Sequence, residues 1–344
     1  MWAGNRPHAA LATTPIYRVS IQRVTERHGM KNSFRTFLTV VVALGLAAAV
    51  RAEEPVGHRM VAHANGHVMI LNAKGEIEWQ VDMPFTSHDI QMLPNGNLLI
   101  QNSITTVVEM TPKKEIVWKH ESKPIASNPG DVQIHAFQRL KNGTTMISET
   151  GNSRIIEVDK EDKIVHEVPY KFDTPPVHSD TRRVRRLDNG HYLAGHEGRG
   201  MIREYDQNGN VVWSYKVDLA GRERAPGGDG HGAEPFGALR LKNGNTLIAG
   251  GNNNRVLEVN KAGEIVWSID RDELPGIHLC WVTSLQALPN GNIIIGNTHA
   301  GPDNPQLIEI SHDKKVVWTY KNFAVVGNNL CGSQVLDVKG KFLH

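Results

Sequence analysis

The stretch Leu241-Lys-Asn-Gly-Asn-Thr-Leu-Ile248 decides the fold, because it joins an Asn-Gly turn to a short apolar strand. Asn and Gly tolerate positive φ, so this dipeptide predicts a two-residue hairpin between adjacent antiparallel strands. The same turn recurs at five positions, which are Asn95-Gly96, Asn142-Gly143, Asn189-Gly190, Asn243-Gly244 and Asn290-Gly291. Their spacings are 47, 47, 54 and 47 residues, close to the ~40 to 50 residues of a propeller blade. The repeat therefore predicts a β-propeller.

The ends of the chain complete the blade count. Each full repeat holds four short strands, which is the content of one blade. Residues 60–79 supply only the later strands of a blade, whereas residues 333–336 and the turn at Lys339-Gly340 resemble the missing first strand. Joined, the two segments make one composite blade that closes the ring. The sequence thus predicts an all-β, six-bladed propeller of four-stranded antiparallel blades.

Two side chains recur once in each repeat. A tryptophan ends the fourth strand and a glutamate lies in the third strand. The tryptophans are Trp79, Trp118, Trp213, Trp267 and Trp318, with His166 in the sixth position, and the glutamates are Glu109, Glu157, Glu204, Glu258 and Glu309. Large aromatic area is what radially stacked sheets bury, so we interpret the tryptophans as packing devices between blades. The glutamates recur in the same way, and we interpret them as part of the architecture.

Residues 30–52 have the composition of a signal peptide. Lys31 and Arg35 give a basic start, an apolar run follows at residues 37–50, and small residues before Glu53 predict cleavage there. The run is shorter than the ~20 residues of a membrane span, so contact with a membrane is expected only through an uncleaved signal.

The segment 1–29 precedes this signal, and we predict that Met30 is the true start codon. Removing residues 1–52 takes away seven Lys/Arg and one acid, so the formal charge falls from +2 to −4. The basicity belongs to the leader, and no nucleic-acid partner is expected. Residues 53–344 are predicted to form a single propeller domain, a monomer that is periplasmic or secreted.

Histidines gather in the loops that lead into the innermost strands. They are His88, His135, His178, His231 and His278. These loops and the loops between second and third strands lie on one face of a propeller, so we expect one polar mouth of the channel. The second class of loop adds His196, Arg199, Asn297 and His299, and Arg182 follows His178. Arginine beside imidazole suits a planar or tetrahedral anion.

Three hypotheses remain open for this mouth. The histidines line a wet channel of a noncatalytic scaffold that binds a protein, or they bind or transfer an anionic group of a small molecule, or some of them hold a divalent metal. The metal candidates are His178, Asp180 and His231, although no close ligand spacing supports them.

Cys280 and Cys331 lie in corresponding loops of neighbouring blades. In an exported protein this arrangement predicts a disulfide that clamps the ring closure and contributes ~4 kcal/mol by the loop-entropy argument. The alternative is a pair of free thiols.

The repeat text Leu257-Glu-Val-Asn-Lys-Ala-Gly-Glu-Ile-Val-Trp267 resembles the quinoprotein-like (PQQ-like) propeller repeats and, more closely, the bacterial arylsulfotransferases. His88-Asp89 before Leu93-Pro-Asn-Gly-Asn97 is similar to a pattern of that family. The resemblance covers roughly residues 58–344. It implies a periplasmic six-bladed propeller that carries a sulfuryl group on a histidine near the channel, assisted by other His, Arg and Asn side chains. The transferring histidine stays unassigned.

The quinoprotein dehydrogenases are the second group that the repeats resemble. They have about eight blades and a vicinal disulfide, whereas six blades and no adjacent cysteines are expected here. The resemblance therefore does not imply bound PQQ, and a metal- or quinone-dependent oxidoreductase is the weaker alternative.

Overall fold

The structure is a computed structural model that describes residues 57–85, 87–170, 177–221, 234–340 and 343–344. These residues belong to a compact unit that spans Glu53–His344. The expected extension over 1–29, the expected signal peptide over 30–52 and His231 lie outside the described residues, so these predictions stay as they are.

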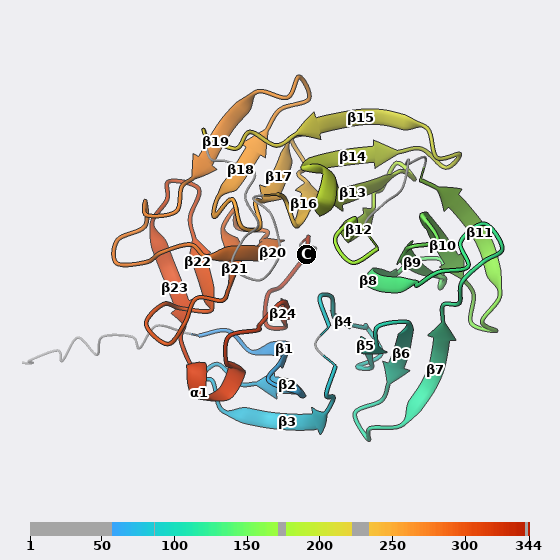
Figure 1. The fold of residues 1–344 in the computed structure, drawn as a ribbon. Helices are drawn as coiled ribbons and strands as arrows, with labels where there is room; N and C mark the ends of the chain where they lie inside the picture. The colour runs from blue at the N-terminus through green and yellow to red at the C-terminus, as the bar shows by residue number, and fades with distance from the viewer. Residues whose placement is uncertain (1–56, 86, 171–176, 222–233, 341–342) are drawn as a thin grey trace, which may run out of the picture. The chain divides into compact units, whose positions relative to one another are not determined.

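Six four-stranded antiparallel sheets surround a central axis, and each sheet is one blade (Figure 1). The strands of each blade are named here from the innermost to the outermost. Blade 1 holds β24 (Gly332–Val335), β1 (Met60–Ala64), β2 (His67–Leu71) and β3 (Ile77–Asp82); blade 2 holds β4 (Gln91–Met92), β5 (Leu98–Ser103), β6 (Thr106–Met110) and β7 (Ile116–Glu121); blade 3 holds β8 (Gln133–Arg139), β9 (Thr145–Thr150), β10 (Arg154–Val158) and β11 (Ile164–Pro169).

The other three blades follow the same plan. Blade 4 holds β12 (Thr181–Arg186), β13 (Tyr192–His196), β14 (Met201–Tyr205) and β15 (Val211–Lys216); blade 5 holds β16 (Gly237–Arg240), β17 (Thr246–Ala249), β18 (Val256–Val259) and β19 (Ile265–Ile269); blade 6 holds β20 (Trp281–Ala287), β21 (Ile293–Thr298), β22 (Leu307–Ile310) and β23 (Val316–Tyr320). The described part of the chain adds only the short helices η1 (Glu197–Arg199) and α1 (Phe323–Val326).

The ring closes as the sequence predicts. Strand β24 from the C-terminal end pairs antiparallel with β1, with Met60 opposite Val335 and His63 opposite Gly332. The composite first blade and the count of six are confirmed.

The Asn-Gly turns differ from the prediction in one respect. Gly96 has φ +83° and Asn95 keeps a negative φ, so the loop is a type I turn followed by a left-handed glycine and not a two-residue type I′ turn. The backbone bonds Gly96 N to Leu93 O (2.9 Å) and Leu93 N to Asn97 O (2.8 Å) define a three-residue loop. Pro94 fits the second position of a type I turn, and Asn95 accepts the amide of Asn97 through its side chain at 3.0 Å.

The recurring tryptophans and glutamates fasten each blade to the next, which confirms their architectural role. The indole N–H of Trp79, for example, donates to the carbonyl of Pro112 in blade 2 at 2.8 Å. The glutamate in the third strand of blades 2 to 6 accepts from its own Asn-Gly hairpin or the strand that follows it. It also pairs with an arginine or a histidine of the next blade. These blade-to-blade pairs are Glu109–Arg139 (2.9 Å), Glu157–Arg186 (3.1 Å), Glu204–Arg240 (2.7 Å), Glu258–His312 (3.4 Å) and Glu309–His58 (2.8 Å).

The apolar core is divided among the junctions between blades. One cluster joins Ala136 and Met146 of blade 3 to Val184 and Tyr192 of blade 4, and all four side chains are buried. Because neighbouring sheets bury their faces against one another, a blade has no complete core of its own. The innermost strands are thereby held rigidly around the axis.

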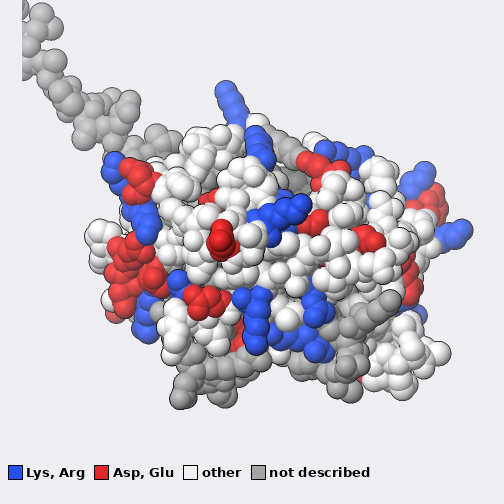
Figure 2. Space-filling model, turned by 90° about the horizontal axis from the view of Figure 1, so that it is seen from above, with Lys and Arg blue, Asp and Glu red and all other residues white. Residues whose placement is uncertain are grey.

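The outer surface carries charges of both signs. In Figure 2 lysines and arginines alternate with aspartates and glutamates over the flank in view. None of the helices in the described ranges is both long and apolar enough to cross a membrane.

His58 closes the series of pairs between blade 6 and blade 1, and this contact predicts a pH dependence of stability. The hydrogen bond to Glu309 raises the pKa of His58, although burial lowers it. A raised pKa means that the stabilisation is complete below the ordinary value of 6.5 and is lost as the pH rises through the folded-state pKa.

We therefore expect His58→Gln to lower the melting temperature most at acidic pH, with the difference from wild type narrowing towards alkaline pH. Thermal denaturation from about pH 5 to pH 9 measures this. His312→Gln is the matched control, because His312 contacts the equivalent Glu258 but is 63% exposed. An equal difference at every pH would contradict the assignment.

Candidate functional site at the histidine cluster

Three of the predicted histidines meet on one face of the propeller. The Nδ1 atoms of His88 and His135 lie 2.9 Å apart, and the two rings stack with centroids 5.0 Å apart. The His178 ring meets that of His135 edge-on at 5.6 Å. His88 is half-buried, His135 is buried and His178 is exposed. We call His88, His135 and His178 the histidine cluster.

Hydrogen bonds to Gln133 link two of these rings. The side-chain oxygen of Gln133 lies 3.0 Å from Nε2 of His135 and 3.0 Å from Nδ1 of His178, and as an acceptor it takes an N–H from each. With the contact between the Nδ1 atoms of His88 and His135, the three imidazoles and Gln133 form one hydrogen-bonded series. A neutral imidazole in such a series can act as a nucleophile or a base.

Aromatic rings extend the cluster towards blade 6. Phe236 meets His88 edge-on at 5.5 Å and Trp281 at 5.5 Å, and Trp281 in turn lies 4.8 Å from the ring of His299. The guanidinium of Arg182 lies over the Phe236 ring at 5.8 Å. The predicted residues His299 and Arg182 thus border the histidine cluster through aromatic side chains.

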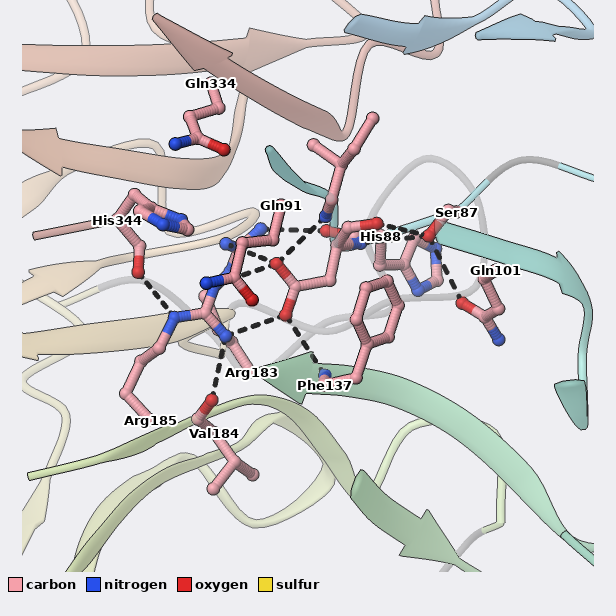
Figure 3. Close-up of polar contacts among 12 residues, drawn as sticks. Ser87, His88, Gln91, Gln101, Phe137, Arg183, Val184, Arg185, Gln334 and His344 are labelled. Atoms are coloured by element: carbon pink, nitrogen blue, oxygen red, sulfur yellow. Dashed lines mark hydrogen bonds and ion pairs between the residues drawn. The ribbon is translucent and has the colours of Figure 1, made fainter. Parts of the chain in front are cut away.

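Directly below His88, Asp89 holds two arginines of β12. Arg185 binds its carboxylate with two nitrogens, each at 2.7 Å, and Arg183 approaches at 3.3 Å. The amide of Phe137 donates to the same carboxylate at 3.2 Å, and Arg183 also donates to the carbonyl of His88 at 2.8 Å. Figure 3 shows Arg183, Arg185 and Phe137 converging on this point, with His344 on the far side of Arg185.

The opposite charges of Asp89 and the two arginines stabilise one another. Burial would raise the pKa of Asp89, but Arg185 and Arg183 outweigh it and hold the pKa below its ordinary value. Burial lowers the pKa of Arg183 to about 10, against the attraction of Asp89. This ion group ties blade 4 to blades 2 and 3 across the axis.

Sequence reasoning identified Arg182 and missed the roles of Asp89 and Arg185. The arginine-rich sequence Thr181-Arg-Arg-Val-Arg-Arg186 could have indicated a buried ion pair. An innermost strand buries its side chains, so arginines there require a buried acid nearby. The sequence does not say which acid.

Four predicted site residues form hydrogen bonds within their own blades and loops. His196 is fully buried, with Nδ1 3.1 Å from the Thr181 hydroxyl and Nε2 2.9 Å from the Tyr205 hydroxyl. Arg199 donates to Asp180 at 3.3 Å. Asn297 is buried and spans two loops by donating to the carbonyls of His278 and Pro305 at 2.9 and 3.2 Å. His278 is exposed and pairs with Asp272 at 2.5 Å.

The disulfide prediction is wrong in this structure, where Cys280 and Cys331 are free thiols. Cys331 is buried, and burial raises its pKa to about 11. Cys280 is half-buried and its Sγ lies 3.7 Å from the carbonyl oxygen of His278. The ring is closed by the β24–β1 ladder, so it does not depend on a covalent clamp.

The metal candidates His178 and Asp180 meet no third ligand among the residues that the structure describes, and the third candidate, His231, lies outside them. Within the described ranges no group of three or more His, Cys, Asp or Glu side chains is arranged to hold a metal ion. His178 is engaged with Gln133, and Asp180 with Thr181 and Arg199.

With this geometry established, comparison with known families becomes informative. A family model described as arylsulfotransferase (ASST) matches residues 106–218. The chain is a propeller protein near the arylsulfotransferase family. The match runs from β6 to just past β15 and includes His135, His178 and the arginine-rich strand β12, whereas His88 and Asp89 precede it. No curated protein sequence matches this propeller.

Solved structures show the same fold at low identity. A protein of unknown function from Bacteroides caccae is 21% identical, with a TM-score of 0.67 over 80% of this chain and 98% of that chain. A streptogramin B lyase is 13% identical, with a TM-score of 0.52 over 78% of this chain and 85% of the lyase. A virginiamycin B lyase from Staphylococcus aureus is 12% identical, with a TM-score of 0.50 over 78% of this chain and 86% of the lyase. These likenesses concern the fold alone.

Removing the buried carboxylate should be strongly destabilising. We expect Asp89→Asn to lower the free energy of unfolding by about 3 to 5 kcal/mol, because it leaves two buried guanidinium groups without their counter-charge. Urea unfolding followed by tryptophan fluorescence measures the change. Glu121→Gln is the control, since it removes an exposed acid that pairs with the exposed Lys119 and should cause no measurable change. A loss no larger than the control would contradict a structural role for Asp89.

His196 and His178 should respond differently to removal. His196→Ala deletes a buried hydrogen-bonded ring and should cost about 1 to 3 kcal/mol of stability. His178→Ala, at an exposed position, should change stability by less than about 0.5 kcal/mol. Parallel thermal denaturation of the two variants tests this, and the reverse order would refute the division between loop and site histidines.

Proposed function

We propose that the histidine cluster binds a small organic anion of the aryl sulfate class in an exported protein and transfers its sulfuryl group to an acceptor hydroxyl. The observation that carries the proposal is the hydrogen-bonded series His88–His135–Gln133–His178. It brings three imidazoles together on one face of the propeller. The neighbouring arginine-rich strand and the family match over residues 106–218 support the same chemistry.

We assign His88 as the nucleophile. Its ring is half-buried and fixed on both sides, by stacking on His135 and by the edge of Phe236. Its backbone carbonyl is held by Arg183. A ring that does not reorient can keep its nucleophilic nitrogen directed at the reacting sulfur. This lowers the entropic cost of reaching the transition state.

The first half-reaction forms a bond between Nε2 of His88 and sulfur while the ester S–O bond breaks. The departing phenolate leaves with the bonding electrons and takes up one proton. In the second half, the acceptor hydroxyl attacks sulfur, the N–S bond breaks and the acceptor loses one proton. We assign His178 in its protonated form to give the first proton and, as the neutral imidazole that results, to take up the second, so the two halves balance.

The test is turnover of 4-nitrophenyl sulfate with phenol as acceptor, together with intact-mass analysis after reaction with the donor alone. Wild type should release 4-nitrophenolate and gain the mass of one SO3 group. His88→Gln should lose both, because the nucleophile is gone. His178→Gln should keep the adduct and slow turnover by about 10² to 10⁴, as expected for general acid–base catalysis.

His278→Gln is the matched control, since this exposed histidine contacts Asp272 and lies outside the histidine cluster. It should retain both turnover and adduct. Turnover without any adduct would overturn the covalent step. If wild type showed no turnover and did not bind the donor, the proposal as a whole would be overturned.

A further inference from the structure

A large cavity in the described part of the propeller lies away from the histidine cluster. Strand β12 leaves the cluster at Thr181 and ends at Arg186, which lines a cavity of about 990 Å³. Three Asn-Gly turns contribute Asn142, Asn189 and Gly244 to its rim. These turns connect the first and second strands of blades 3, 4 and 5, so they lie at the opposite ends of those strands. We call this hollow the turn-side cavity.

Its polar lining is rich in cations. Seven lysines and arginines line it, against three acids. The cations are Arg139, Lys141, Arg185, Arg186, Arg240, Lys242 and Lys261, and the acids are Glu157, Asp188 and Glu204. Each of the acids already pairs with one of the cations, at 3.1, 3.4 and 2.7 Å. Lys242 and Lys261 are exposed at the rim and add positive potential that the lining acids do not offset.

The same walls are apolar between the charges. Five leucines, a valine and a tryptophan line the cavity, namely Leu140, Leu187, Leu239, Leu241, Leu343, Val212 and Trp213. The side chain of Val212 is 49% exposed. Concave, mainly apolar sites with a few fixed polar groups are typical of small-molecule binding.

Two guanidinium groups are held in fixed positions for an anion. Arg186 stacks on Tyr192 at 4.5 Å and donates Nε to Glu157, while its Nη1 has no hydrogen-bond acceptor among the described residues. Arg240 lies over Trp213 at 4.8 Å and donates to Glu204 at 2.7 Å. Stacked guanidiniums lose little freedom on binding and match carboxylate or sulfonate oxygens.

We propose that the turn-side cavity is a second binding site, for a small organic anion that joins an apolar body to a carboxylate, sulfate or sulfonate group. The apolar walls take the body, and Arg186 with the rim lysines takes the head group. The site is separate from the histidine cluster and needs no chemistry there.

The probe is 2-naphthalenesulfonate, which carries no transferable ester, measured by titration calorimetry at low and high salt. Wild type should bind one molecule per chain, more weakly at high salt because the rim charges are screened. Lys242→Glu/Lys261→Glu should weaken binding about tenfold. Lys113→Glu/Lys160→Glu makes the same change of net charge at exposed positions outside the cavity lining and should leave the affinity within about twofold.

Three results would overturn the proposal: no binding heat, equal weakening by both lysine pairs, or equal affinity for neutral 2-naphthalenemethanol. Loss of binding in His88→Gln with none in Lys242→Glu/Lys261→Glu would assign the probe to the histidine cluster instead. Turnover of 4-nitrophenyl sulfate should be unchanged in Lys242→Glu/Lys261→Glu. The two proposals can therefore fail separately.

Discussion

The buried carboxylate of Asp89 is the contact on which the centre of this propeller depends. Two arginines from β12 reach it across the axis, and the amide of Phe137 reaches it from blade 3. Burying arginine on an innermost strand is costly unless the charge is paired and fully hydrogen-bonded. Asp89 supplies that pairing, and because it follows His88 in the chain it also fixes where the histidine cluster lies.

Around this centre, the blades are joined by a repeated contact at their outer halves. A glutamate of one blade accepts from a cation of the next, and a neighbouring indole donates to a backbone carbonyl. Each pair alone contributes little when partly exposed. Repetition around a closed ring makes them cooperative, because no blade can move without breaking contacts on both sides.

Rigid strands with variable loops explain how one fold offers two chemically different mouths. The ends of the strands near His178 carry imidazoles that are hydrogen-bonded to Gln133. The opposite ends carry the Asn-Gly hairpins, whose glycine is in the left-handed conformation, together with stacked arginines. Strand β12 contributes to both, since Arg182 faces the aromatic rings beside the cluster and Arg186 faces the turn-side cavity.

The sequence by itself determined the architecture. The spacing of the turns predicted six blades, and the split repeat at the two ends predicted that β24 pairs with β1. The recurring Glu and Trp residues indicated the architecture that is repeated in the blades. These features are local and periodic, so they can be read along the chain. It also indicated one face rich in histidine, and His88, His135 and His178 do meet there.

Only the tertiary structure decided which polar residues act together. His278 precedes its Asn-Gly turn as the cluster histidines do, and His196 and Asn297 follow theirs, yet each of the three is taken up by partners in its own blade. Cys280 and Cys331 stay unbonded although their loops correspond. Asp89 meets Arg185 at a separation of 96 residues. A repeat specifies the position of a side chain within its blade, but the direction it takes depends on neighbours that are distant in sequence.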